Sequence, residues 1–229
     1  MRGENVSLFN SLVDFVRVSL EWLYQVSVHI GIPSYALAIV FLTVIIKVLL
    51  YPLTYKQMKS MRTMQELQPK IKELDKKYKN DPKKKQEAMM EVYKQHGANP
   101  MAGCLPLLIQ FPILIALFRG LQSFHPTNPE YYNFFWISDL GKADPTGIIL
   151  PLLVGLTTFA QQYVTSPNAN DPTQKTMLYA MPVLFGWMTR SFPAGLALYW
   201  IVFSVVGTIQ QIMINKGIKP APAKEGAKE

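Results

Sequence analysis

Charged side chains are scarce in this chain of 229 residues: 17% of the residues are charged, whereas 49% are hydrophobic. Acidic residues are absent from five apolar windows, which are residues 33–53, 101–121, 147–165, 177–191 and 193–214. One soluble core cannot bury so much apolar surface. The composition therefore predicts an all-α membrane protein whose five windows are transmembrane helices, since a bilayer crossing takes about 20 apolar residues.

The window 177–191 is shorter than a membrane span needs. About 15 residues of helix rise roughly 22 Å, whereas the hydrocarbon core of a bilayer is about 30 Å thick. Two explanations stay open: the helix extends beyond this window, or the membrane is thinner beside it.

Residues that build reactive or metal-binding centres are nearly missing as well. Cys104 is the single cysteine, so no internal disulfide is possible, and its small apolar neighbours indicate a packing role. His29, His96 and His125 are far apart in the sequence. No glycine-rich phosphate loop, G-x-S-x-G or H-E-x-x-H motif occurs. We therefore expect a protein that is not an enzyme and uses neither a metal nor a cofactor.

Basic residues gather on one side of the predicted spans. Residues 54–100 hold 12 of the 23 lysines and arginines, and the segments after the third and fifth windows add Lys175 and four further lysines. By the positive-inside rule, the N-terminus lies outside and the C-terminus lies in the cytoplasm. This topology explains the net charge of +8, so DNA binding is not needed to account for it.

The segment before the first window, residues 1–32, has the pattern of an amphipathic helix. Apolar residues share one helical face and polar residues share the other: Phe9, Leu12, Val16, Leu20, Leu23 and Ile30 against Asn10, Asp14, Arg17, Glu21 and Gln25. Such a helix is expected to lie in the outer membrane interface. The alternative is a signal peptide, but the basic start and uninterrupted apolar stretch are missing. A leader removed upstream of Met1 stays open.

The basic loop 54–100 is predicted to form a helical hairpin. Apolar residues recur at steps of three and four along both halves: Met64, Leu67, Ile71, Leu74 and Tyr78, then Met89, Val92, Tyr93 and His96. The sequence KNDPKK between them provides a turn, and HGANP ends the second helix. A pair of solvated helices that only connects two spans is the alternative.

Lys47 lies inside the first window, where a lysine costs about 2.5–3.5 kcal/mol. Thr43 lies one helical turn away on the same face. Polar rows also follow the cytoplasmic halves of two other windows: Thr158, Gln161, Gln162 and Thr165 in the third, and Trp200, Ser204, Thr208, Gln211 and Asn215 in the fifth. We expect these rows to line a water-filled pocket that opens to the cytoplasm. The alternatives are helix-to-helix hydrogen bonds and snorkelling of Lys47 to the headgroups.

A pocket with a cation and no carboxylate is poorly suited to proton-coupled transport, which usually relies on titratable acids. It suits a protein that briefly holds polar or acidic peptide segments away from lipid. The residues alone therefore favour a protein that handles other polypeptides, either by helping polar segments across lipid or as a scaffold that packs the spans of other proteins, over a transporter.

Several long motifs in a fixed order cover nearly the whole chain: KVLLYPLT, LQPKIKEL, HGANPMAGCLPLLIQFPILIALF, FFWISDL, ILPLLVG, MPVLFGWM and FPAGLALYW. Together they resemble the YidC family of bacterial membrane protein insertases. The resemblance implies five spans, an outer amphipathic helix, a cytoplasmic helical hairpin, and a hydrophilic groove that opens to the cytoplasm and to lipid. It also implies that nascent membrane proteins are inserted into the bacterial inner membrane, alone or with the Sec translocon.

The resemblance also assigns residues to the groove. The groove charge of the family is usually an arginine five residues before the proline of the YP motif, and Lys47 takes that place here. Lysine retains the charge but lacks the planar fork that binds carboxylates in bidentate fashion. Gln161, with Gln162 as the alternative, and Trp200 correspond to groove positions on other helices.

The remaining segments are assigned more coarsely. Residues 122–146 are expected to form an extracytoplasmic loop, and residues 215–229 a flexible cytoplasmic tail too weakly basic for strong ribosome binding. The hairpin and the loop 166–176 are either contacts for a ribosome or targeting receptor, or simple connectors. The large outer domain of many relatives is missing, so the chain resembles the short form or a trimmed core.

Overall fold

The computed structural model describes residues 2–98, 105–165 and 172–217. In these ranges the chain is helical, with one isolated bridge between Phe134 and Ile137. The elements are α1 (Arg2–His29), α2 (Tyr35–Leu49), α3 (Tyr51–Glu66), α4 (Gln68–Lys77), α5 (Pro82–Gln95), α6 (Leu105–Gln122), η2 (Pro129–Tyr131), α7 (Ile149–Thr165), α8 (Pro172–Thr189) and α9 (Ala194–Gly217). The predicted all-helical fold is confirmed for these residues. Cys104 and most of the predicted tail lie outside them.

α2 and the first residues of α3 form one apolar run, which a proline interrupts. Ser34 caps the start of α2 by accepting a hydrogen bond from the Leu37 N–H, and α2 ends at Leu49. Pro52 has no N–H to continue the helical hydrogen-bond ladder, so the chain bends there. The bend between α2 and α3 is 58°. α3 therefore takes up the first part of the range that was predicted to be a hairpin.

Only part of the predicted five-span topology follows from helix length. Within the described residues, α9 is the helix long and apolar enough to cross a bilayer by itself, and the bent pair α2–α3 would make a second span. α6, α7 and α8 have 17 or 18 residues each, just short of the usual length. α8 begins at Pro172, before the window 177–191. The helix therefore extends beyond the short window toward the N-terminus, and five spans stay a prediction.

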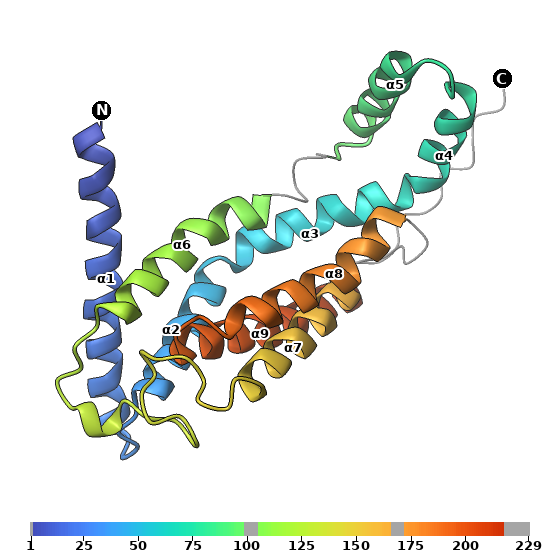
Figure 1. Ribbon diagram of the computed structural model, residues 1–229. Helices are drawn as coiled ribbons and strands as arrows, with labels where there is room; N and C mark the ends of the chain where they lie inside the picture. Colours follow the sequence, from blue (N-terminus) through green and yellow to red (C-terminus); the bar gives the residue numbers. More distant parts are fainter. Residues whose placement is uncertain (1, 99–104, 166–171, 218–229) are drawn as a thin grey trace.

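The helices α2, α7, α8 and α9 run together in one bundle, with α9 packed against both α2 and α7 (Figure 1). α7 and α8 approach closely because two glycines face each other. A Cβ atom at Gly186 would lie 2.8 Å from the Pro151 carbonyl oxygen, and one at Gly155 would lie 3.3 Å from the Pro182 carbonyl oxygen. Small residues are the usual means of bringing membrane helices into contact.

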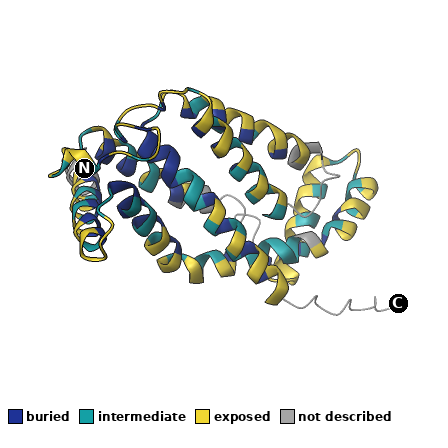
Figure 2. Cartoon of the chain, turned by 90° about the horizontal axis from the view of Figure 1, so that it is seen from below, coloured by how far each residue is buried: buried dark blue, intermediate teal, exposed yellow. Residues whose placement is uncertain are grey.

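The most deeply buried residues gather in the half of the bundle nearer α1 (Figure 2). Aromatic rings fill this region. Tyr24 and Tyr35 stack with ring centroids 4.0 Å apart, and Phe124 and Tyr132 meet Tyr35 edge-on. The Tyr35 hydroxyl donates to the Glu21 carboxylate at 2.9 Å. This end of the bundle is thus a packed aromatic core.

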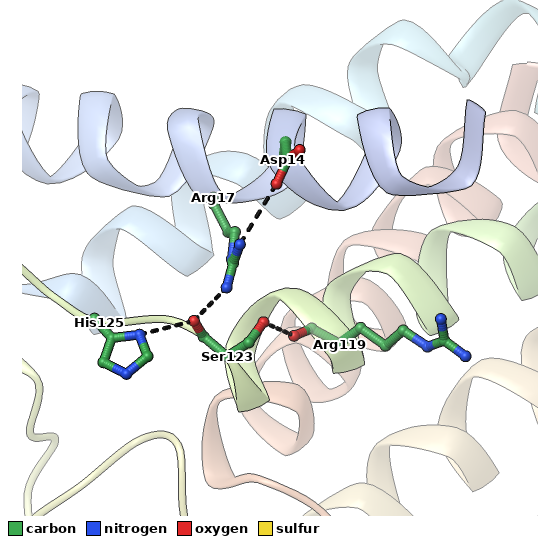
Figure 3. Close-up of polar contacts among 5 residues, drawn as sticks. All are labelled: Asp14, Arg17, Arg119, Ser123 and His125. Atoms are coloured by element: carbon green, nitrogen blue, oxygen red, sulfur yellow. Dashed lines mark hydrogen bonds and ion pairs between the residues drawn. The ribbon is translucent and has the colours of Figure 1, made fainter. Parts of the chain in front are cut away.

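α1 is fastened to the rest of the protein through its apolar face. Val13, Val16, Leu20 and Leu23 are buried against α2 and α6. The Arg17 guanidinium reaches across to the Ser123 carbonyl at the end of α6 (Figure 3), where a cation is favoured by the helix dipole. The apolar face predicted for an interfacial helix is therefore covered by protein along much of its length. A different apolar row is exposed on α1: Phe15, Val18 and Trp22.

α4 and α5 pack against each other at the far end of the molecule from the loop 123–148 (Figure 1). The buried residues between them are Leu67, Ile71, Tyr93 and Ala98, with Met64, Leu74, Met89 and Val92 packed around them. Asp81 caps α5 by accepting from the Lys84 N–H, and the Asp75 carboxylate pairs with Lys85 at 2.8 Å. Most of the predicted apolar stripes meet here, although His96 lies exposed.

Asp144 ties the loop 123–148 to the start of α7. Its buried carboxylate accepts hydrogen bonds from Trp136 Nε1 at 3.0 Å, from the Thr146 N–H and hydroxyl at 3.0 and 2.7 Å, and from the Leu150 N–H at 2.9 Å. Burial alone would raise the pKa of Asp144, but these hydrogen bonds outweigh it and lower the pKa below its ordinary value.

We predict that Asp144→Asn destabilises the protein by about 1–3 kcal/mol, because the amide nitrogen cannot accept the hydrogen bonds that the carboxylate accepts. The stability difference between wild type and variant is present above about pH 3.9, the ordinary aspartate pKa. It disappears as the pH falls through the lowered native pKa. Thermal melting in detergent across the acid range checks this, with the exposed Asp14→Asn as control. An equal effect of both variants would contradict the prediction.

Candidate functional site

Lys47 of α2 points into the bundle. Its side chain is 6% exposed, and its ammonium nitrogen lies 3.3 Å from the centroid of the Phe203 ring on α9. The ammonium is therefore directed between α2 and α9 rather than along α2 toward the membrane surface. Among the described residues, no carboxylate forms an ion pair with it.

Two features stabilise this charge without a carboxylate. The face of an aromatic ring attracts a cation, most strongly where water is excluded. Lys47 also lies in the last turn of α2, where the helix dipole favours positive charge. The Lys47 carbonyl, freed near the break in the helix, accepts a hydrogen bond from Gln210 Nε2 of α9 at 3.3 Å. α9 thus contacts both the side chain and the backbone carbonyl of Lys47.

Gln161 of α7 meets Lys47 at Gly207 of α9. A Cβ atom at Gly207 would lie 2.8 Å from Lys47 Nζ and 2.6 Å from Gln161 Nε2. The missing side chain of Gly207 therefore makes the space that both polar groups occupy. Gln162 lies one residue further along α7, about 100° around the helix. Of the two glutamines that the sequence left open, Gln161 is the one beside Gly207.

A hydrogen bond between Trp200 and Thr158 joins α9 to α7, about one turn of α7 before Gln161. Trp200 Nε1 donates to the Thr158 hydroxyl at 2.9 Å, and Thr158 is buried. The Trp200 ring stacks on Phe185 of α8 with centroids 4.4 Å apart. Thr43 is fully buried one turn from Lys47 and donates to the Ile39 carbonyl within α2. It therefore contributes packing more than a free polar group.

Several polar atoms of α9 are buried without a hydrogen-bond partner in the described part of the chain. They are Ser204 Oγ, Gln210 Oε1 and Gln211 Oε1. Thr208, by contrast, donates to the Ser204 carbonyl at 2.8 Å, and Gln211 Nε2 donates to Asn215 Oδ1 at 2.9 Å. Buried polar atoms normally have partners, so α9 carries unused hydrogen-bonding capacity beside the lysine.

A cavity of about 150 Å³ lies at the C-terminal end of the polar rows on α7 and α9. Its lining comes from three helices: Met58, Met61 and Arg62 of α3, Val164 and Thr165 of α7, and Gln211 and Asn215 of α9. Thr165 and Gln211 each lie one turn beyond the residues at the Lys47 level. The polar rows of α7 and α9 therefore line a hollow, but its third wall is α3, and Lys47 is not part of the lining.

Phe203 and Gly207 are site residues that the sequence analysis missed. Phe203 is one apolar residue among many in its window, and nothing in the sequence distinguishes it from a lipid-facing one. Gly207 could have been found, because it lies between Ser204 and Gln211 at helical spacing on the polar row. A glycine on such a row indicates a close approach.

The site consists of one lysine together with neutral polar and aromatic side chains. Within the described residues, no three His, Cys, Asp or Glu side chains lie together as metal ligands would. What it offers is a cation, neutral hydrogen-bonding groups and an adjoining hollow. Such a site can hold a polar or acidic group reversibly.

Comparisons with known proteins identify the family of this chain. The profile of the 60Kd inner membrane protein family matches residues 26–222. The chain is 43% identical over 209 residues to the membrane protein insertase YidC of Wolinella succinogenes, covering 91% of this chain and 38% of that protein. It is 44% identical over 224 residues to that of Geobacter metallireducens, covering 97% of this chain and 40% of that protein. The chain thus spans about two fifths of these relatives' length.

A solved structure is similar as well. The crystal structure described as an active YidC insertase with its first transmembrane domain resolved has a TM-score of 0.64 and 32% sequence identity, over 89% of this chain and 45% of that one. The fold is therefore shared at a level where the sequences are also clearly related. On the extent of the matching profile, this chain belongs to the 60Kd inner membrane protein family.

Proposed function

We propose that this chain is a membrane protein insertase of the bacterial inner membrane, and that it also helps its clients to fold. The relatives named above carry the insertase description. The observation that carries the proposal is Lys47, an inward-pointing cation beside Gln161 and unpartnered polar atoms of α9. Nascent membrane proteins are the substrates, received alone or from the Sec translocon.

The proposed topology has five spans, formed by α2, α6, α7, α8 and α9, with the N-terminus outside and the C-terminus in the cytoplasm. α1 lies at the outer interface, and α4 and α5 lie in the cytoplasm, where they are candidate contacts for a ribosome or targeting receptor. Helices of 15 to 18 residues rise only about 22–27 Å. The bilayer beside them is therefore thinner than its usual 30 Å or so.

In the proposed mechanism, a polar segment of the client enters from the cytoplasm through the hollow under α3. The hydrogen-bonding groups of α7 and α9 replace part of its water, and the Lys47 ammonium offsets acidic charge on it. Desolvation is the main barrier to moving polar groups into a bilayer, so a partial substitute for water halfway across lowers that barrier without an energy source. The client's apolar helix meanwhile moves directly into lipid.

Lys47→Leu is expected to impair insertion of a test protein with an acidic translocated loop, because the counter-charge is lost. Lys47→Glu is expected to impair it further by repulsion, whereas Lys47→Arg retains activity. Insertion is measured by protease protection in cells depleted of the native insertase, alongside immunoblots of variant abundance. Lys56→Leu removes an exposed lysine of α3 as the matched control. Normal insertion by an abundant Lys47→Leu variant would contradict a working groove charge.

Gly207→Ala leaves both polar residues in the sequence but is expected to reduce insertion. The added methyl displaces Lys47 Nζ and Gln161 Nε2 from their places. Gly217→Ala on the same helix is the control, since no atom lies within 4 Å of a Cβ there. The same protease-protection assay applies. Equal activity of the two variants would mean that the meeting of Lys47 and Gln161 is not needed.

A photocrosslinking amino acid at position 47, 161 or 200 is expected to react with the client segment of a stalled nascent membrane protein. The same probe at Met90, an exposed residue of α5, serves as the reference for contacts outside the bundle. Adducts from position 90 alone, with clients that cross normally but fold poorly when this chain is missing, would instead indicate a scaffold.

A further inference from the structure

An apolar tip projects from the outer loop between α6 and α7. Phe135 is 84% exposed, and its φ of 50° is the only positive value at a non-glycine residue in the described part of the chain. Bulky residues rarely adopt this conformation because it strains the backbone. Two hydrogen bonds hold the turn: Phe134 N–H to the Ile137 carbonyl at 2.8 Å, and Ile137 N–H to the Phe134 carbonyl at 2.9 Å. The ring is thus held outward.

The tip has a rigid foundation. The Phe134 and Phe135 ring centroids lie 4.4 Å apart, and those of Phe135 and Trp136 lie 6.2 Å apart. Trp136 Nε1 donates to the buried Asp144 carboxylate at 3.0 Å. A strained, exposed aromatic on such a support is a built feature of the loop rather than a frayed end.

Asp144 also links the tip to α7. The same carboxylate accepts from the Leu150 N–H in the first turn of that helix. From this point an exposed apolar row descends along α7 at helical spacing: Ile149, Leu152 and Leu156. The stretch YYNFFWIS, residues 131–138, carries no charged side chain. The aromatic tip and the lipid-facing row of α7 therefore share one anchor point.

We propose that Phe135 and Trp136 insert into the outer leaflet at the boundary between headgroups and acyl chains, and thereby fix the depth at which α7 enters the bilayer. Amphipathic aromatic rings favour this zone of a membrane. The tip is uncharged and is joined to the lipid-facing row of α7, which favours phospholipid over a protein partner. The inference rests on the proposed placement of α7 as a span with residues 122–146 outside.

The test uses the full chain in vesicles of phosphatidylethanolamine and phosphatidylglycerol. Single cysteines replace Phe135, Leu152 or Lys142 in a Cys104→Ser background, and each carries an environment-sensitive fluorophore. Nitroxides on the upper or lower acyl chain quench labels in lipid, and iodide quenches labels in water. We expect position 135 to be quenched best by the upper nitroxide, position 152 by the lower one, and the exposed position 142 by iodide.

Each of the other outcomes overturns the inference in a different way. If position 152 is quenched by lipid and position 135 by iodide, the tip does not insert and the span still stands. If neither is quenched by lipid, the placement of α7 fails and the inference fails with it. Shielding of position 135 from both quenchers would indicate a protein contact and would overturn the lipid assignment.

The anchoring role is tested separately with a label at Ile148, just before α7. Phe135→Gly removes the ring and suits the positive φ, so the turn is retained. In this variant we expect the label to shift toward water, with red-shifted emission and weaker quenching by the upper nitroxide. Phe135→Trp keeps an aromatic ring and is expected to preserve the wild-type profile. An unchanged profile in Phe135→Gly would show that the tip does not set the depth of α7.

Discussion

The buried ammonium of Lys47 is the constraint around which the inner half of the bundle is arranged. Phe203 offers it a ring face, Gly207 leaves it room, and the end of α2 provides a favourable dipole. None of these is a fixed counter-ion, and no carboxylate of the described residues pairs with it. A buried ion pair would have to be broken before the lysine could serve another acid. In the proposed function, the charge can therefore meet an acidic group of a client without first losing another partner.

The two halves of the bundle differ in how closely they are packed. The outer half is the one nearer α1, and the inner half is the one that contains the Lys47 ammonium. The outer half holds the stacked tyrosines, the close-packed residues of α9 such as Ala194 and Tyr199, and the Asp144 carboxylate with its four hydrogen bonds. The inner half holds the cavity and the unpartnered oxygens of α9. Unpaired buried polar atoms and voids each cost stability. The close packing of the outer half stabilises the fold and offsets the cost of the cavity and unpaired atoms in the inner half.

Much of the fold could be predicted from periodicity and composition, whereas the close contacts could not. Helical spacing indicated the polar rows of Thr158, Gln161 and Ser204. The residues that share one face of a helix do not depend on which other helix packs against it. Choosing Gln161 over Gln162 needed the rotation of α7, which depends on packing. The bend at Pro52 determines that α3, rather than α2, walls the cavity. α1 showed its apolar face in the sequence, but not that α2 and α6 cover it.

The bend after α2 has a mechanical consequence. Leu50 alone separates α2 from α3. Its N–H donates to the Ile46 carbonyl of α2, and its carbonyl accepts from the Thr54 N–H of α3. The two helices are thus linked through the hydrogen bonds of this one residue. A displacement of α4 and α5 would therefore act through α3 on the turn that carries Lys47. In the proposed topology, a contact at the cytoplasmic surface could in this way shift the polar interior without any ligand reaching it.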